Sequence, residues 1–194
     1  MFMSDQIGGN ATALLSPARV GTNISNNNDL HSLAGAWILD VSRSDTMEGY
    51  LRCMMMPSVA IEAQLAGELA HQSRNVFALD DSLLLLHKKT HVNDFTETFE
   101  LDQENVTRGS SGVKRTMASL LQRGRHDAIV VETLMPTHCH TFRLVEMRRV
   151  LGDGSTHTQD IHLQNLDTGA ESTTRRTWIR VNMTQQDRQK LFED

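Results

Sequence analysis

The segment Ser172-Thr173-Thr174-Arg175-Arg176-Thr177-Trp178-Ile179-Arg180-Val181 near the end of the chain is predicted to form a β-strand. Because side chains alternate between the two faces of a strand, Arg176 and Trp178 point to the same side. This pair is a poor pattern for a packed core, but it suits a hydrated cavity that holds an anionic headgroup beside an apolar body. The alternative is an exposed strand face with a solvated arginine and one anchoring tryptophan.

The order of the elements upstream favours the cavity. Trp37 and Leu39 alternate with smaller or polar residues, which predicts a first strand beginning after Leu33. Two short helices are expected next, over residues 48–56 and 59–71, with Ser44-Asp45-Thr46 and Ser58 as capping residues. The buried face of the second helix is expected to carry apolar residues at helical spacing, namely Ile61, Leu65 and Leu69.

The rest of the chain is predicted to be short strands joined by turns. Alternating patterns between turn signals indicate strands at 76–79, 83–89, 95–101, 112–121, 128–135, 141–151, 158–166 and 173–181, with one more at 103–107. The predicted fold is therefore all-β, an antiparallel up-and-down barrel of about ten strands with a two-helix lid after the first strand. We expect a disordered tail at 1–30, the barrel domain at 31–183 and a short tail at 184–194.

Composition excludes several classes of function. The 194 residues are 39% hydrophobic and carry a net charge of -5, with no basic run that would indicate nucleic-acid binding. No apolar stretch approaches the roughly 20 residues of a transmembrane helix. The two cysteines, Cys53 and Cys139, do not make a disulfide framework, so a cytoplasmic location is expected. The protein is expected to be a monomer.

Four motifs between Leu33 and Val181 resemble those of the intracellular fatty-acid-binding proteins, a family of lipocalin-like calycin barrels. The segment Gly35-Ala36-Trp37-Ile38-Leu39 looks like the family's opening Gly-x-Trp-x-Leu, and residues 42–51 are similar to its Ser-x-Asn-Phe-Asp-x-Tyr-Leu stretch. Arg176-Thr177-Trp178 looks like its Arg-x-Tyr headgroup motif. Arg149 stands four residues before Asp153-Gly154, as the family's second headgroup arginine does.

The resemblance implies non-catalytic binding and transport of fatty acids or similar hydrophobic anions inside the barrel. Arg149, Arg176 and Trp178 would bind the ligand, with both arginines on its carboxylate. A buried arginine is costly unless it is paired, and a carboxylate supplies a bidentate partner. Trp178 in place of tyrosine leaves only an N–H donor and narrows the space. Arg149 has a surface alternative, because Arg148 is its neighbour and strand parity decides which of them points inward.

A plugged barrel that acts as a protein-interaction module is an alternative. Glu97 lies in phase with Phe95 and Phe99. If this face is interior, Glu97 pairs with a buried arginine or its pKa rises, and an internal pair would compete with a ligand. If the face is exterior, Glu97 is solvated.

A haem or other tetrapyrrole carrier is the second alternative, with His87 or His91 as an axial ligand. His138-Cys139-His140 suggests a metal, but three adjacent residues cannot all face one ion, so we expect solvated turn histidines. No phosphate loop or nucleophile elbow occurs. We therefore expect no metal, no cofactor and no enzymatic activity.

Overall fold

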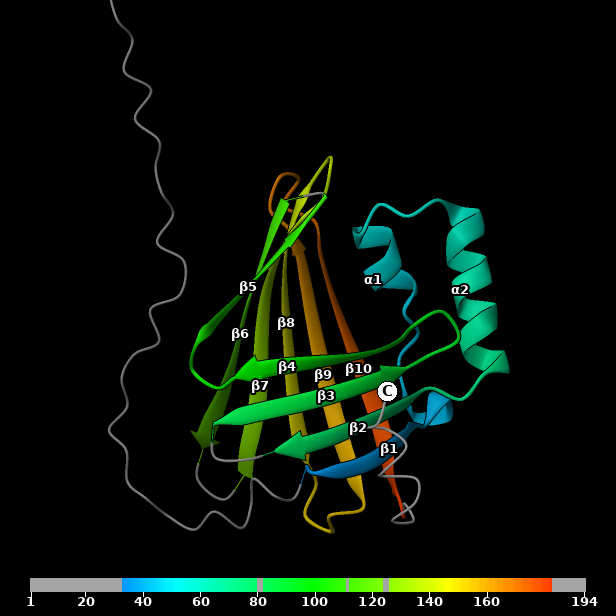
Figure 1. Cartoon of the computed structure of the whole chain (residues 1–194). Coiled ribbons are helices and arrows are strands. Elements are labelled where there is room, and N and C mark those ends of the chain that lie inside the picture. Colours follow the sequence, from blue (N-terminus) through cyan, green and yellow to red (C-terminus); the bar gives the residue numbers. More distant parts are fainter. Residues whose placement is uncertain (1–32, 80–81, 111, 124–125, 183–194) are drawn as a thin grey trace, which may run out of the picture.

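The computed structural model describes residues 33–79, 82–110, 112–123 and 126–182 (Figure 1). The tails predicted at 1–30 and 184–194 lie outside the described residues. The elements begin with β1 (Gly35–Leu39), the 3-10 turn η2 (Val41–Arg43), α1 (Glu48–Cys53) and α2 (Ser58–Ala70). The remaining nine are strands: β2 (Arg74–Leu79), β3 (Leu83–Lys89), β4 (Asp94–Glu100), β5 (Glu104–Gly109), β6 (Gly112–Arg123), β7 (His126–Pro136), β8 (Thr141–Val150), β9 (Thr156–Asn165) and β10 (Glu171–Val181).

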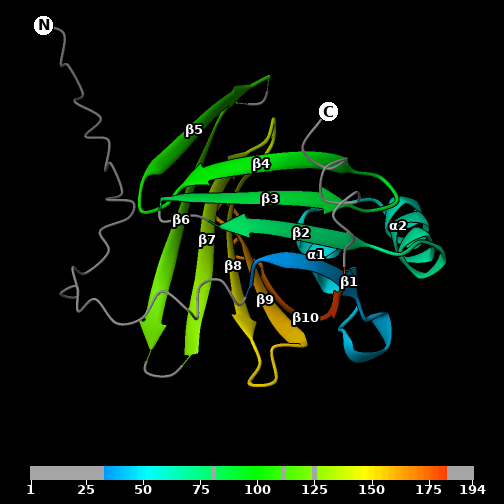
Figure 2. The same ribbon diagram turned by 60° about the horizontal axis from the view of Figure 1, so that its bottom comes forward.

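All ten strands form one antiparallel sheet in the order β4-β3-β2-β1-β10-β9-β8-β7-β6-β5. The sheet turns back on itself where β1 pairs with β10, so β1 to β4 cross in front of β6 to β9 (Figures 1 and 2). The predicted fold class, an all-β barrel with two helices after the first strand, is confirmed.

The barrel is nearly closed, with a seam between β4 and β5. These two strands end the sheet and are not neighbours in its ladder. Across the seam, Leu101 and Ala118 form an isolated bridge, and Nζ of Lys114 on β6 lies 2.8 Å from Oε1 of Glu97 on β4. Glu97 therefore faces the interior, as its phase with the buried Phe99 predicts.

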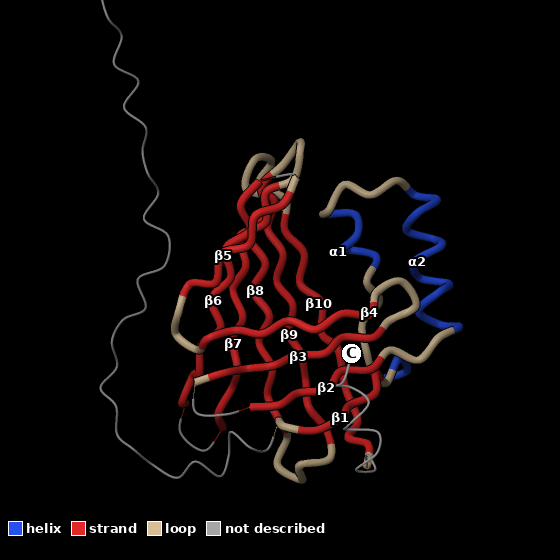
Figure 3. The backbone as a smooth tube through the Cα atoms, in the orientation of Figure 1, coloured by secondary structure: helices blue, strands red, loops and turns tan. Residues whose placement is uncertain are grey.

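The two helices lie beside one end of the barrel (Figure 3). α1 buries Leu51 and Cys53, whereas Ile61 is the buried residue of α2. Leu69, expected on the buried face of α2, is 76% exposed, which contradicts that part of the prediction. None of the helices among the described residues is long and apolar enough to cross a membrane.

The predicted capping residues of α1 serve another purpose. The N-cap of α1 is Met47 and makes no side-chain capping bond. Instead, Oγ of Ser44 accepts a hydrogen bond from the backbone N–H of Thr177 at 2.9 Å, and Oδ2 of Asp45 accepts one from that of Arg175 at 2.8 Å. Tertiary contacts to β10 have replaced the local cap, and they fix the start of the lid to the strand that carries Arg176.

The core fills the end of the barrel away from the helices. Trp37 is fully buried, and its Nε1–H donates to the carbonyl of Leu33 at 2.8 Å. Its cluster includes Phe77, Leu84 and Trp178. A second cluster, with Cys53, Phe142 and Leu163, lies beneath α1. Between the two clusters the interior also carries charged and polar side chains, among them Glu146, Arg148 and Gln159.

Candidate functional site

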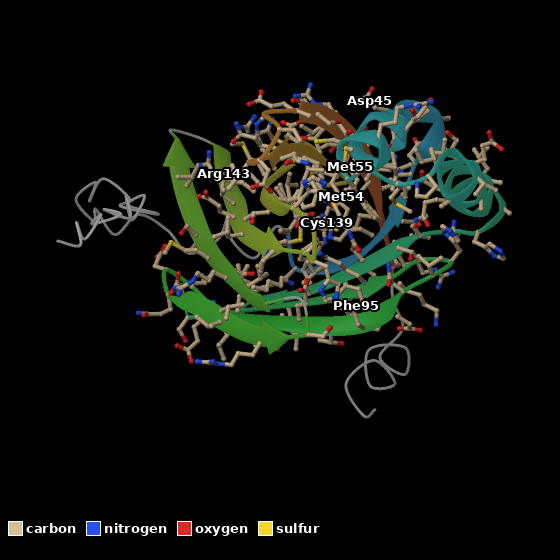
Figure 4. The ribbon with its side chains drawn as sticks, turned by 90° about the horizontal axis from the view of Figure 1, so that it is seen from above. Asp45, Met54, Met55, Phe95, Cys139 and Arg143 are labelled. Carbon is tan, nitrogen blue, oxygen red and sulfur yellow. The ribbon has the colours of Figure 1, made fainter. Side chains whose placement is uncertain are left out.

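A cavity of about 250 Å³ lies between the two helices and the inner wall of the barrel. Its apolar lining includes Leu39, Met47, Tyr50, Leu144, Ile161 and Trp178. Its charged lining consists of Glu68, Lys88, Glu146, Arg148 and Arg176. Figure 4 looks down on the barrel and shows Asp45 and Met54 on the helical side and Phe95 on the side of β3 and β4.

Two buried arginines stand in one row across the inner wall. Gln159 on β9 is the register partner of Arg148 on β8 and also of Arg176 on β10. Neighbouring strands lie about 4.8 Å apart, so the two arginine backbones are separated by roughly 10 Å. That separation lets two long side chains converge on one headgroup.

Arg148 is the less completely paired of the two. Its residue is 2% exposed, and its Nη2 lies 3.2 Å from Oε1 of Glu146. Its Nε and Nη1 have no hydrogen-bond partner among the described residues, and the guanidinium carbon lies 5.1 Å from the centroid of the Phe77 ring. Burial lowers the pKa of Arg148, while Glu146 and Glu97 oppose that shift. A guanidinium remains charged in such surroundings, so Nε and Nη1 are buried donors without an acceptor among the described residues.

Glu146 is the internal partner of this arginine. Its Oε1 also accepts a hydrogen bond from Nε2 of Gln159 at 2.5 Å, and its Oε2 lies 3.8 Å from Nζ of Lys88. Burial acts to raise the pKa of Glu146, but the charges of Lys88 and Arg148 outweigh it, so the pKa falls. Glu146 is therefore an ionised carboxylate inside the barrel, a group that the sequence analysis missed.

Glu97 completes this group of charges. It pairs with Lys88 at 3.2 Å and with Lys114 at 2.8 Å. Burial acts to raise its pKa, but the two lysines outweigh burial and lower it. The expectation of an arginine partner or a raised pKa was therefore wrong. Three cations, Lys88, Lys114 and Arg148, face two carboxylates, Glu97 and Glu146, which leaves one positive charge beside the cavity.

Arg176 points into the same cavity from β10, as the sequence predicts. Its Nη1 donates to the backbone carbonyl of Asp45 at 2.7 Å, and its Nη2 pairs with Oε1 of Glu68 from α2. Burial lowers the pKa of Arg176 to about 10, and the charge of Asp45 partly offsets this. Arg176 is therefore cationic at neutral pH and already has a carboxylate partner from the lid.

Trp178 separates the charged row from the core. Its Nε1–H donates to Oε1 of Gln159 at 3.0 Å, so the single donor of the indole is used. Its ring stacks on that of His157, with centroids 5.8 Å apart, and Trp37 meets the same histidine edge-on at 4.5 Å. These rings form an apolar floor below the arginines.

Arg149 does not line the cavity, in contrast to the sequence prediction. Arg148 does, and Arg149 lies on the other face of β8, where its Nη2 is 3.5 Å from Sδ of Met147. The alternation of β8 carried the signal for this assignment. Phe142 and Leu144 share the parity of Arg148, and Phe142 is fully buried. The ligand-binding role of Arg176 and Trp178 stays a prediction.

Tyr50 on α1 adds a neutral hydroxyl to the cavity wall. Burial, together with the charge of Glu146, raises the pKa of Tyr50 to about 12. The phenol therefore remains protonated and can donate a hydrogen bond to an anion.

The histidines considered as haem ligands lie in different places. His91 lines the cavity, whereas His87 does not, since its Nδ1 lies 3.0 Å from Oγ1 of Thr96 on the neighbouring strand. Within the described part of the chain, no group of three or more His, Cys, Asp or Glu side chains could hold a metal ion.

The structure resembles solved lipid-binding barrels at low sequence identity. A fatty acid transporter, REP1-NXSQ, is 18% identical with a TM-score of 0.54, covering 78% of this chain and 98% of that one. The Caenorhabditis elegans lipid binding protein 8 is 12% identical with a TM-score of 0.56, covering 78% and 97%. The Schistosoma mansoni fatty acid binding protein in complex with arachidonic acid is 16% identical with a TM-score of 0.54, covering 79% and 99%.

The sequence itself matches no protein-family model and no curated protein. The resemblance to the fatty-acid-binding proteins is therefore shown at the level of the fold.

Proposed function

We propose that this protein binds small hydrophobic anions, such as short- or medium-chain fatty acids, in the cavity beneath its helices. The observation that carries the proposal concerns Arg148 at the cavity wall, whose buried Nε and Nη1 have no hydrogen-bond partner in the described part of the chain. Leaving buried charged donors without acceptors is costly, and the carboxylate of a ligand would supply an acceptor to this guanidinium.

The charge balance supports an anion over a neutral ligand. One positive charge is left over among the ion pairs around Glu146 and Glu97, and Glu68 balances the charge of Arg176. Arg176 and the Tyr50 hydroxyl add hydrogen-bond donors to the same cavity. The apolar part of the ligand would lie against Leu144, Ile161 and Trp178. Burial there would contribute roughly 0.8 kcal/mol per methylene group.

The size of the cavity favours a compact ligand. Its volume of about 250 Å³ is below the roughly 300–1,000 Å³ of typical small-molecule sites. The side chains of Trp178 and the Glu146 network occupy space that a long acyl chain would need. We therefore infer that affinity is highest for chains well shorter than arachidonate.

In this proposal the protein binds and transports its ligand in the cytoplasm and catalyses no reaction on it. The solved barrels that share this fold include a fatty acid transporter and two lipid- or fatty-acid-binding proteins. Cys53 is buried and free, and Cys139 is exposed and free, which suits a reducing compartment. We expect the protein to act as a monomer, without nucleic acid.

Isothermal titration calorimetry of the delipidated full chain tests this function. A series from octanoate to octadecanoate should show binding with an optimum at the shorter chains, and 1-decanol should bind more weakly than decanoate. Solvent extraction and mass spectrometry of the protein as purified should find hydrophobic carboxylates. No binding in the series and nothing in the extract would contradict the proposal.

The plugged barrel remains a second candidate because of one observation. Glu146 already supplies Arg148 with a carboxylate from within the barrel. If that internal network is the final state, the calorimetric series shows no binding, and the barrel would serve as a rigid interaction module.

A further inference from the structure

We propose that Glu68 is a displaceable internal ligand of Arg176, so that an anion that binds this arginine releases helix α2. The inference rests on the proposed function and adds a lid whose closure is set by the ligand's headgroup. Glu68 projects from the lid into the cavity and places its carboxylate where the carboxylate of a ligand would bind Arg176.

The Glu68–Arg176 pair joins two elements that are otherwise weakly connected. α2 buries only Ile61, while Val59 and Leu69 on the same helix are 74% and 76% exposed. A helix of 13 residues with one buried side chain gains little from packing against the barrel. An ion pair in which the two side chains are 15% and 4% exposed is therefore a main link between α2 and β10.

A second contact places the carboxylate. Gly67, the residue before Glu68, packs against the β3–β4 turn so closely that a Cβ there would collide with the ring of His91. The His91 ring in turn stacks on that of His71, which follows α2, with centroids 6.3 Å apart. This close approach brings the C-terminal half of α2 over the mouth of the cavity and directs Glu68 inward.

The guanidinium group of Arg176 can bind only a limited number of anionic partners. Its Nη1 is held by the carbonyl of Asp45, which leaves the Nη2 side for Glu68 or for a ligand carboxylate. Two carboxylates at one guanidinium edge would repel each other in a site of low dielectric. Binding of an anion at Arg176 and closure of the lid by Glu68 are thus in competition, and an uncharged ligand does not enter this competition.

Glu68→Gln in the full chain tests the proposal, with decanoate and 1-decanol as the probes. Gln keeps the size and helix propensity of Glu but loses the charge. We expect about tenfold tighter binding of decanoate, because the ligand no longer displaces a charged hydrogen bond. Binding of 1-decanol should stay the same. Glu62→Gln, at an exposed position of the same helix, is the matched control and should change neither affinity.

Hydrogen exchange across 58–70 tests the latch independently of affinity. Exchange should be faster in ligand-free Glu68→Gln and Arg176→Gln than in the parent and in Glu62→Gln. Decanoate should speed exchange of α2 in the parent, and 1-decanol should not. In the Arg176→Gln background, adding Glu68→Gln should leave decanoate affinity unchanged, because the arginine for which Glu68 and decanoate compete is absent.

Two results would overturn the inference, and a third separates it from the proposed function. Unchanged α2 exchange in Glu68→Gln would show that the ion pair does not hold the lid. Equal or weaker decanoate binding by that variant would show that Glu68 does not compete. If no variant binds decanoate, the proposed function and the coupling both fail, while faster exchange in Glu68→Gln would still support a latch.

Discussion

Arg148 and Arg176 flank the same residue, Gln159, in register across three adjacent strands of the barrel wall. Gln159 ties the row together, since it donates to Glu146 and accepts from the indole of Trp178. Both guanidinium groups therefore line one cavity, and one ligand headgroup can reach both.

This shared row predicts non-additive effects on binding. Arg176→Gln and Arg148→Gln should each weaken decanoate binding, by about tenfold to a hundredfold for a lost charged hydrogen bond. The double variant should lose less than the sum of the two free-energy changes, because both residues act on one carboxylate. Calorimetric titration of the four proteins measures this. Strict additivity would place the two arginines at separate anions.

Glu146→Gln should have opposite effects on stability and on binding. The change leaves the buried Arg148 without this carboxylate, and breaking such a pair costs about 3–5 kcal/mol of the free energy of unfolding. Decanoate should bind more tightly, since its carboxylate takes the vacant place. Urea unfolding with and without decanoate measures both effects. Glu132→Gln, whose partner Arg143 has a side chain 43% exposed, should change little.

Trp37→Ala should be among the most damaging core changes. Trp37 is fully buried, and its removal leaves a large cavity that the surrounding strands cannot close. We expect the free energy of unfolding to fall by about 3–5 kcal/mol in urea titrations. Val92→Ala, at a position 57% exposed, is the control. Equal unfolding curves for the parent and Trp37→Ala would contradict the structure of the barrel core.

His157 should make the protein lose stability as the pH falls. Burial, with the charges of Arg148 and Arg180, holds its pKa well below 6.5, and neither ring nitrogen has a hydrogen-bond partner among the described residues. At a pH between its folded and unfolded pKa values, His157 is protonated in the unfolded chain but neutral in the folded chain. The contribution of His157 to the free energy of unfolding is therefore complete above about pH 6.5, and it declines as the pH falls toward the folded pKa.

Urea unfolding at pH 7.5 and pH 5.0 checks this effect, in a range above the ordinary pKa of carboxylates. His157→Phe keeps an aromatic ring between the tryptophans and should reduce the loss of stability between the two pH values. His138→Phe, at an exposed turn, is the matched control. An equal loss in the parent and in His157→Phe would exclude His157 as the cause.

The strands were predictable from the sequence because alternation and turn residues are local signals. The predicted strand at 83–89 matches β3, and those at 112–121 and 141–151 differ from β6 and β8 only at their ends. The capping of α1 was not predictable. Ser44 and Asp45 could equally well bind the helix or β10, and tertiary contacts decided the outcome.

The site was predicted in part. Arg176 and Trp178 were placed in the cavity by their shared strand face, and their position is as expected. To decide which of Arg148 and Arg149 faces the cavity, the parity of the strand is needed, and Phe142 and Leu144 supply it. Glu146 shares the parity of Arg148 on β8, so the same alternation carried the signal for that pair. Glu68 and Lys88 come from other elements, α2 and β3, and no local pattern shows that Glu68 meets Arg176 or that Lys88 meets Glu146.

The most direct test of the account compares two adjacent arginines on one strand. Decanoate should bind Arg148→Gln about tenfold to a hundredfold more weakly than the parent. It should bind Arg149→Gln as it binds the parent, because Arg149 lies outside the cavity. Neither change should alter binding of 1-decanol. Unchanged decanoate affinity in Arg148→Gln, or an equal loss in Arg149→Gln, would contradict an anion site at Arg148.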